Sequence, residues 1–184
     1  MYNITGGNLL LDSRLILDKA KIKEGARVAE LGCGGHGHFV FSSADRVGRS
    51  GTVYAIDILK NSLESLEKRA RQENYKNIKT ILSDLEIFGA TKIESGSLDV
   101  ALLINTLHMS VKRAEVVREA VRMLKRGGKL VVVEWKESSS PFGPDANQRV
   151  NKENLEKVMA KIGLRLEEDF PAGQYHYGLV FTKI

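Results

Sequence analysis

The sequence predicts an α/β protein with a mainly parallel, seven-stranded sheet that ends in an antiparallel C-terminal hairpin. Three observations support this fold class. Short β-branched runs alternate with segments of helical spacing along most of the 184 residues, which is typical of parallel strands joined by crossover helices. A glycine-rich loop follows the first of these runs. The last two strand-like runs are joined by a link too short to contain a helix.

Five strands are expected before the hairpin, because five short runs are rich in β-branched and other apolar residues. They cover residues 27–31, 52–57, 77–82, 98–104 and 129–135. The third, fourth and fifth runs are nearly continuous in apolar residues, so we expect these strands to be buried on both faces. Helical segments space the five strands, which predicts parallel pairing with right-handed crossovers.

Helices are expected where apolar residues recur every three or four positions and so share one face. Two series have this spacing: Leu59, Leu63, Leu66 and Ala70, and then Ala114, Val117, Val121 and Leu124. A helix over about 12–20 precedes the first strand, and another begins after the glycine loop. A late helix is expected over about 152–162, with Asn151 as its N-cap and Gly163 as its C-terminal stop.

The C-terminal part predicts a change of topology. Residues 164–170 and 175–183 are strand-like and are joined by 171–174 alone, so they should form an antiparallel hairpin. Segment 136–150 is the least regular in the chain, with three serines at 138–140, Pro141, Gly143 and Pro144. Because it follows the fifth strand, we expect a lid or substrate wall at the carboxyl edge of the sheet, or a plain surface connector.

Length and composition predict one globular domain over residues 1–184, with 42% hydrophobic residues. Charges interrupt every apolar run before it could span a membrane, and residues 1–20 do not have the pattern of a signal peptide, so we expect a cytoplasmic protein. Cys33 is the only cysteine. We therefore expect no intramolecular disulfide, no cysteine-based metal site and no redox role.

The net charge of +5, from 28 basic and 23 acidic residues, is mild. Part of the basic charge gathers on one predicted helix and the turn after it: Lys112, Arg113, Arg118, Arg122, Lys125, Arg126 and Lys129. A solvated helix face is the favoured interpretation. The alternative is a nucleic-acid-binding face, although no series of aromatic residues accompanies the cations.

The glycine loop predicts a nucleotide-type cofactor. Gly32, Gly34 and Gly37 follow the first strand, where glycines permit a tight turn, close approach of the backbone to a ligand and close helix–strand packing. Asp57 lies 20 residues after the last glycine, at the end of the second strand, where a carboxylate can bind a ribose diol. These features allow either NAD or S-adenosylmethionine (SAM).

Five segments resemble motifs of the class I SAM-dependent methyltransferases, and they cover residues 28–34, 53–57, 83–85, 103–107 and 124–130. The resemblance implies a Rossmann-like, doubly wound fold and SAM as the cofactor. It places Glu30 in the hydrogen-bond network of the cofactor's amino group, Asp57 on the ribose and Asp84 on the adenine amino group. The implied cofactor-binding residues are Glu30, Gly32, Cys33, Gly34, Gly37, Asp57, Ile58, Asp84, Leu85 and Asn105.

The sequence departs from this family's pattern at the glycine loop. The family usually spaces its three glycines by two, whereas His36 occupies the third position here and Gly37 follows one residue later. The loop is therefore one residue longer than usual. A smaller departure is Arg126, at a position where proline is common.

Three histidines are candidates for a general base or a substrate-contacting group, because imidazole titrates nearest neutral pH. His108 follows the fourth strand, His38 follows the glycine loop, and His176 begins the last strand. For each of them a hydrogen-bonded packing role is the alternative. No metal site is expected.

The resemblance favours methyl transfer to a small molecule, since the cofactor core is similar to the ubiquinone/menaquinone-type C-methyltransferases. Residues 105–108 do not match the Asn/Asp-Pro-Pro-aromatic motif of methyltransferases that modify amide or adenine nitrogens. We expect the substrate site to be built from segments 2–12 and 136–150, with a homodimer as a further option.

Three alternatives stay open. The first is an RNA or protein methyltransferase that docks through the basic helix, and the second is a non-catalytic protein that binds SAM or S-adenosylhomocysteine (SAH). The third, an NAD oxidoreductase, is disfavoured because too few residues are left for a substrate domain.

Overall fold

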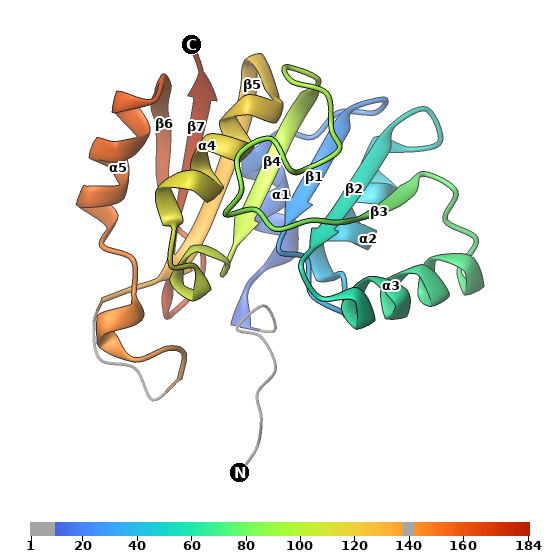
Figure 1. Ribbon diagram of the computed structural model, residues 1–184, viewed down its shortest axis with the longest axis horizontal. Helices are drawn as coiled ribbons and strands as arrows, with labels where there is room; N and C mark the ends of the chain where they lie inside the picture. Colours follow the sequence, from blue (N-terminus) through green and yellow to red (C-terminus); the bar gives the residue numbers. More distant parts are fainter. Residues whose placement is uncertain (1–9, 138–141) are drawn as a thin grey trace.

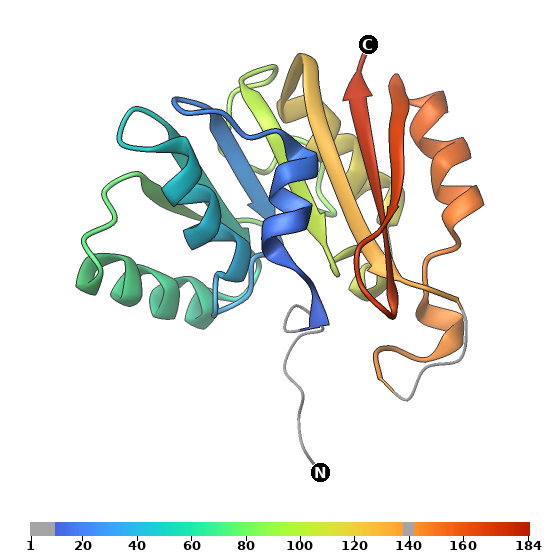
Figure 2. The same ribbon diagram turned by 180° about the vertical axis from the view of Figure 1, so that it is seen from behind.

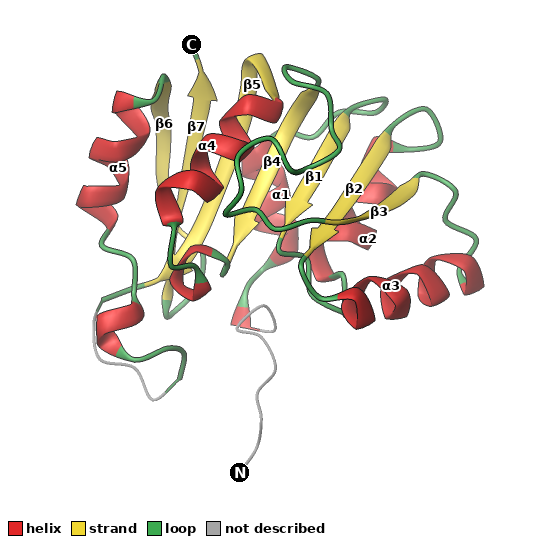
Figure 3. Cartoon of the chain, viewed as in Figure 1, coloured by secondary structure: helices red, strands yellow, loops and turns green. Residues whose placement is uncertain are grey.

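Seven strands form one sheet in the computed structural model, which describes residues 10–137 and 142–184 (Figures 1 and 3). They are β1 (Arg27–Leu31), β2 (Thr52–Asp57), β3 (Ile78–Leu82), β4 (Leu98–Ile104), β5 (Leu124–Trp135), β6 (Leu164–Pro171) and β7 (His176–Lys183). Their order is β3-β2-β1-β4-β5-β7-β6. Strands β1 to β5 pair in parallel, and β7 runs antiparallel to both β5 and β6. The predicted sheet and its C-terminal hairpin are confirmed.

Helices cover both faces of the sheet, as Figures 1 and 2 show from opposite sides. One face packs against α1 (Ser13–Ala20), α2 (His38–Val47) and α3 (Lys60–Gln72), and the other against α4 (Arg113–Met123) and α5 (Lys152–Lys161). Asn151 caps α5, because its side chain accepts a hydrogen bond from Asn154 N at 2.8 Å. None of the described helices is long and apolar enough to cross a membrane.

Three local expectations are wrong. Strand β3 is not buried on both faces, because it lies at the edge of the sheet and none of its residues is buried. The connection between β3 and β4, residues 83–97, contains turns and no helix. Strand β5 begins at Leu124, five residues early, and its pairing with β4 is irregular between Leu124 and Lys129.

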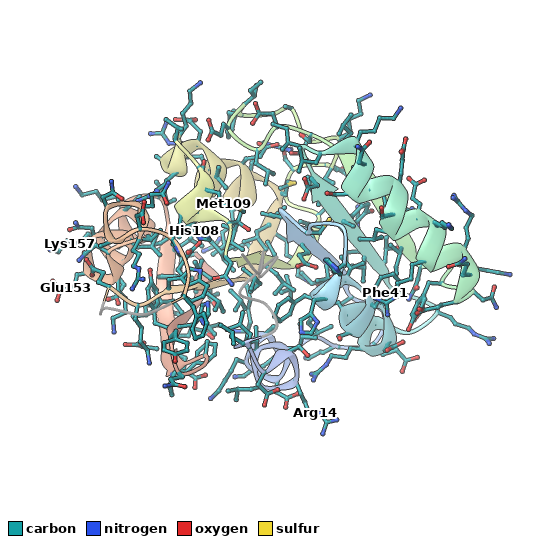
Figure 4. All side chains as sticks on the ribbon, turned by 90° about the horizontal axis from the view of Figure 1, so that it is seen from below. Arg14, Phe41, His108, Met109, Glu153 and Lys157 are labelled. Carbon is teal, nitrogen blue, oxygen red and sulfur yellow. The ribbon has the colours of Figure 1, made fainter. Side chains whose placement is uncertain are left out.

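The order of the strands reverses between β1 and β4, since the chain first proceeds outward to β2 and β3 and then crosses back. In open α/β sheets such a switch point leaves a crevice at the carboxyl ends of the strands, where ligands bind. This carboxyl edge faces down in Figure 1, and Figure 4 views the molecule from that side.

Segments 2–12 and 136–150, predicted to build a substrate site, are described in part. Residues 2–9 and 138–141, including the serines and Pro141, lie outside the described residues. The described part of the second segment contains a short 3-10 turn, Ala146–Gln148.

Candidate functional site

The glycine loop bends over the carboxyl end of β2. Gly32 N and Cys33 N both donate to Ile56 O, at 2.8 and 3.0 Å. Gly34 has φ +62°, and a Cβ atom placed there would meet no other described atom within 4 Å. The backbone at Gly34 therefore borders open space, which leaves room for a ligand to approach the main chain.

Asp57 ties this loop to the start of the next connection. Its Oδ2 accepts a hydrogen bond from Gly34 N and its Oδ1 from Leu59 N, both at 2.8 Å. A carboxylate oxygen can accept two hydrogen bonds. Each oxygen of Asp57 thus keeps one acceptor position, which suits a pair of hydroxyl groups such as a ribose diol.

Glu30 is a buried carboxyl group at the end of β1. The residue is 1% exposed, and its side-chain oxygens have no hydrogen-bond partner among residues 10–137 and 142–184. Burial raises the pKa of Glu30 well above its usual value, and the charge of Asp57 adds to this shift. The backbone N–H of Val40 offsets part of this rise in pKa, although it does not meet the geometric criteria of a hydrogen bond. A carboxyl group buried in this way is stabilised by a cationic partner.

The buried thiol of Cys33 interacts electrostatically with both Glu30 and Asp57. Burial raises the pKa of its thiol, and Glu30 and Asp57 raise it further. The thiol therefore remains protonated at neutral pH and is a poor nucleophile.

The other candidate cofactor residues lie at the carboxyl ends of β2, β3 and β4. Asp84 Oδ1 accepts from Glu86 N at 2.8 Å and shapes the turn after β3, and Leu85 is buried. Ile58 follows Asp57 and is 61% exposed. Asn105 has φ +53°, and its backbone N–H donates to Val133 O at 2.8 Å. The sheet thus brings the candidate residues of four segments to one edge.

His108 lies on the short turn η2 (Leu107–Met109) after β4, at the edge shown in Figure 4. Its Nδ1 atom lies 2.9 Å from Glu134 Oε2, and its side chain is 12% exposed. Glu134 Oε1 accepts from the backbone N–H groups of Leu107 and His108, at 2.7 and 3.3 Å. Glu134 was not among the site residues predicted from the sequence. A single acid inside the buried apolar end of β5 was the signal that could have revealed it.

His176 is fully buried beside Trp135. The two ring centroids are 4.1 Å apart, and neither ring nitrogen of His176 has a hydrogen-bond partner among the described residues. Burial lowers the pKa of His176 to about 4, and the charges of His108 and Lys136 act in the same direction. His176 is therefore neutral at physiological pH.

His38 makes its contacts with other residues than those of His108 and His176. It begins α2 and packs edge-on against Phe39, with ring centroids 5.2 Å apart. Burial lowers its pKa, and Arg69 and His36 add to the shift. Arg69 also binds the lengthened glycine loop, because its Nη1 donates to His36 O at 3.2 Å.

The described ends of two segments meet near Trp135 and His176. At Gly173, a Cβ atom would lie 2.9 Å from Leu10 O and 3.8 Å from His176 Nδ1. At Gly143, a Cβ atom would lie 2.6 Å from the Trp135 ring. The N-terminal segment and the segment after β5 therefore converge on one part of the carboxyl edge.

Most of the basic residues on and after α4 have partners within the chain. Arg122 pairs with the fully buried side chain of Glu119 at 2.8 Å, and Arg118 pairs with Glu115 at 3.0 Å. Arg113 Nε donates to Leu107 O at 2.9 Å. The remaining ion pairs join Lys125 to Asp99 and Lys129 to Glu167.

Comparisons with known proteins agree with this arrangement. A family model described as a methyltransferase domain matches residues 22–172. A demethylmenaquinone methyltransferase of Lactococcus lactis is 31% identical over 156 residues, which cover 80% of this chain and 60% of that protein. A ubiquinone/menaquinone biosynthesis C-methyltransferase of Hahella chejuensis is 27% identical over 130 residues, which cover 70% of this chain and 51% of that protein.

Solved structures show the same fold. A SAM-dependent methyltransferase from Aquifex aeolicus superposes with a TM-score of 0.87 and 20% identity, covering 98% of this chain and 94% of that one. By contrast, the chain spans between half and 60% of the length of the two sequence relatives named above.

Proposed function

The chain belongs to the class I SAM-dependent methyltransferases, and on that premise we propose that it transfers the methyl group of SAM to a small-molecule acceptor. When bound, SAM supplies an electrophilic methyl group on a sulfonium, and the electron pair of the carbon–sulfur bond stays on sulfur when this methyl group is transferred. The enzyme then has to align the acceptor with this group and provide a fitting electrostatic environment.

One observation carries the proposal. Glu30 is a buried carboxyl group without a hydrogen-bond partner in the described part of the chain, and it interacts electrostatically with Asp57 at the switch point of the sheet. SAM fits these residues, since it offers a cationic amino group for Glu30 and a ribose diol for the free acceptor positions of Asp57. In this proposal Asp84 binds the adenine amino group, and the backbone at Gly34 lies against the cofactor.

The acceptor side of the proposal rests on two further points. The Lactococcus lactis relative is a demethylmenaquinone methyltransferase, whose name refers to a small organic acceptor. In this chain the described ends of the segments predicted to line the acceptor converge on Trp135 and His176. An RNA acceptor has less support, because most cations of the α4 region are already paired with acids or carbonyl groups.

Calorimetric titration with SAM, SAH and NAD tests the proposal. We expect SAM and SAH to bind and NAD not to bind. Asp57→Ala removes one or two charge-assisted hydrogen bonds and should weaken SAH binding about 10- to 100-fold. Asp45→Ala is the matched control, since Asp45 lies on α2 and accepts from Tyr75 OH, away from the loop. Binding of NAD alone, or of none of the three ligands, would contradict the proposal.

A further inference from the structure

Glu134 is a buried acid whose described hydrogen bonds all go to one short turn. Its side chain is 0% exposed, and a carboxylate in such a place is costly unless hydrogen bonds satisfy it. It has three such contacts, from Leu107 N, His108 N and His108 Nδ1. The acid therefore fixes both the backbone of η2 and the ring of His108.

The pairing also determines which nitrogen of His108 carries the hydrogen. A carboxylate can only accept, so His108 Nδ1 must donate to Glu134 Oε2. In the neutral ring this leaves the lone pair on Nε2. Nε2 makes no hydrogen bond to any residue within 10–137 and 142–184, and the ring keeps some exposure at the carboxyl edge of the sheet.

Resting on the proposed function, we infer that Glu134 is a positioning residue that holds His108 as the general base, and that the methyl acceptor carries a proton it must lose, as a hydroxyl group does. The acceptor's lone pair forms the new bond to the methyl carbon, while the carbon–sulfur pair remains on sulfur. The acceptor's proton passes to His108 Nε2. Glu134 balances the charge of the imidazolium, and the proton then leaves to water.

Glu134→Gln separates this role from a purely structural one. The amide oxygen can replace Oε1 and keep both backbone hydrogen bonds of η2. The amide nitrogen then replaces Oε2 and donates to His108 Nδ1, so the ring hydrogen moves to Nε2. Turn η2 therefore keeps its two backbone hydrogen bonds to residue 134, whereas His108 Nε2 loses its free lone pair and can no longer accept a proton. Glu64→Gln is the matched control, because Glu64 lies on α3 with its side chain 58% exposed and pairs with Lys60 at 3.5 Å.

Nuclear magnetic resonance of ¹⁵N-histidine-labelled protein with SAH bound tests the hydrogen positions directly, with His108→Gln identifying the signals. We expect the Nδ1–H form of His108 in the wild type and in Glu64→Gln, and the Nε2–H form in Glu134→Gln. An Nε2–H ring in the wild type, or no change in Glu134→Gln, would overturn the inference. This readout requires no methyl acceptor.

Calorimetry and turnover complete the test. SAH affinity should stay within about threefold of the wild type in Glu134→Gln. With a panel of phenols as acceptors, kcat should fall roughly 10²- to 10⁴-fold, the usual contribution of a general base, with little change in KM. Full activity of Glu134→Gln would overturn the inference and leave the proposed function standing. Failure of the wild type to bind SAH would instead contradict the proposed function.

Discussion

Replacing Glu30 with glutamine should stabilise the cofactor-free protein, even though it removes a residue proposed to bind the cofactor. Glu30 is 1% exposed, and its carboxyl group has no hydrogen-bond partner in the described part of the chain. Burial raises its pKa above the ordinary value of 4.5. The folded protein must therefore either hold a buried negative charge or take up a proton that the unfolded chain has lost. Glutamine avoids both costs.

The sign and size of the effect follow from this difference in pKa. Below pH 4.5, Glu30 is protonated in both the folded and the unfolded chain, so the stability linked to it is fully present. As the pH rises from there through the folded-state pKa, the unfolded chain releases the proton more readily and this stability is lost. Each pH unit in that window costs the wild type about 1.4 kcal/mol of unfolding free energy. The gap between Glu30→Gln and the wild type should thus widen from about pH 4.5 up to the folded-state pKa of Glu30, by at most about 1.4 kcal/mol per pH unit, and stay constant above that pKa.

Urea denaturation at several pH values between 5 and 8 measures this gap, with the fluorescence of the single tryptophan, Trp135, as the signal. Glu64→Gln is the control, since the side chain of Glu64 is 58% exposed on α3. The difference in unfolding free energy between Glu64→Gln and the wild type should stay near zero at every pH. Saturating SAH should narrow the gap for Glu30→Gln, because a cationic amino group would stabilise the wild-type carboxylate. A gap that is independent of pH, or that narrows as the pH rises, would refute the reasoning.

Two further predictions concern stability. Gly37→Ala should cost about 2–5 kcal/mol and Gly34→Ala only about 1–2 kcal/mol in urea denaturation; both positions have positive φ, but a Cβ at Gly37 would lie 2.8 Å from Leu66 Cδ1. Equal costs would contradict this. His176→Phe should remove a pH dependence, because a neutral buried histidine contributes stability above its ordinary pKa of 6.5 that is lost as the pH falls through about 4. The wild type should therefore lose about 3 kcal/mol more than His176→Phe between pH 7.5 and pH 4, and parallel stability profiles would count against it.

Local sequence patterns predicted the elements well, since they depend on neighbouring residues. Strands β1, β2 and β4 have the expected limits, because an apolar run that ends at glycine or a polar residue can be recognised without knowing its partner strands. Asn151 was identified as a helix cap for the same reason, since a cap bonds to a residue three positions away. The glycine loop and Asp57 were also found from spacing alone, and the structure joins them through Gly34 N.

Other features depend on which segments become neighbours, and these were missed. The run that forms β3 is as apolar as that of a central strand, but its place at the edge leaves it partly exposed. Glu134 was missed because its partners lie 26 and 27 residues earlier in the chain, on η2. No local pattern shows that an acid on β5 will face a histidine after β4.

The sequence by itself determined the α/β fold class, the order of most elements and the set of polar residues that end the strands. Only the tertiary structure decided that Glu30 is buried with no hydrogen-bond partner among the described residues, that His108 is oriented by Glu134, and that His176 is held neutral against Trp135. The physical reason is that periodicity and capping act over a few residues. Burial, the resulting pKa shifts and the orientation of a ring are set by groups that only the packed sheet brings together.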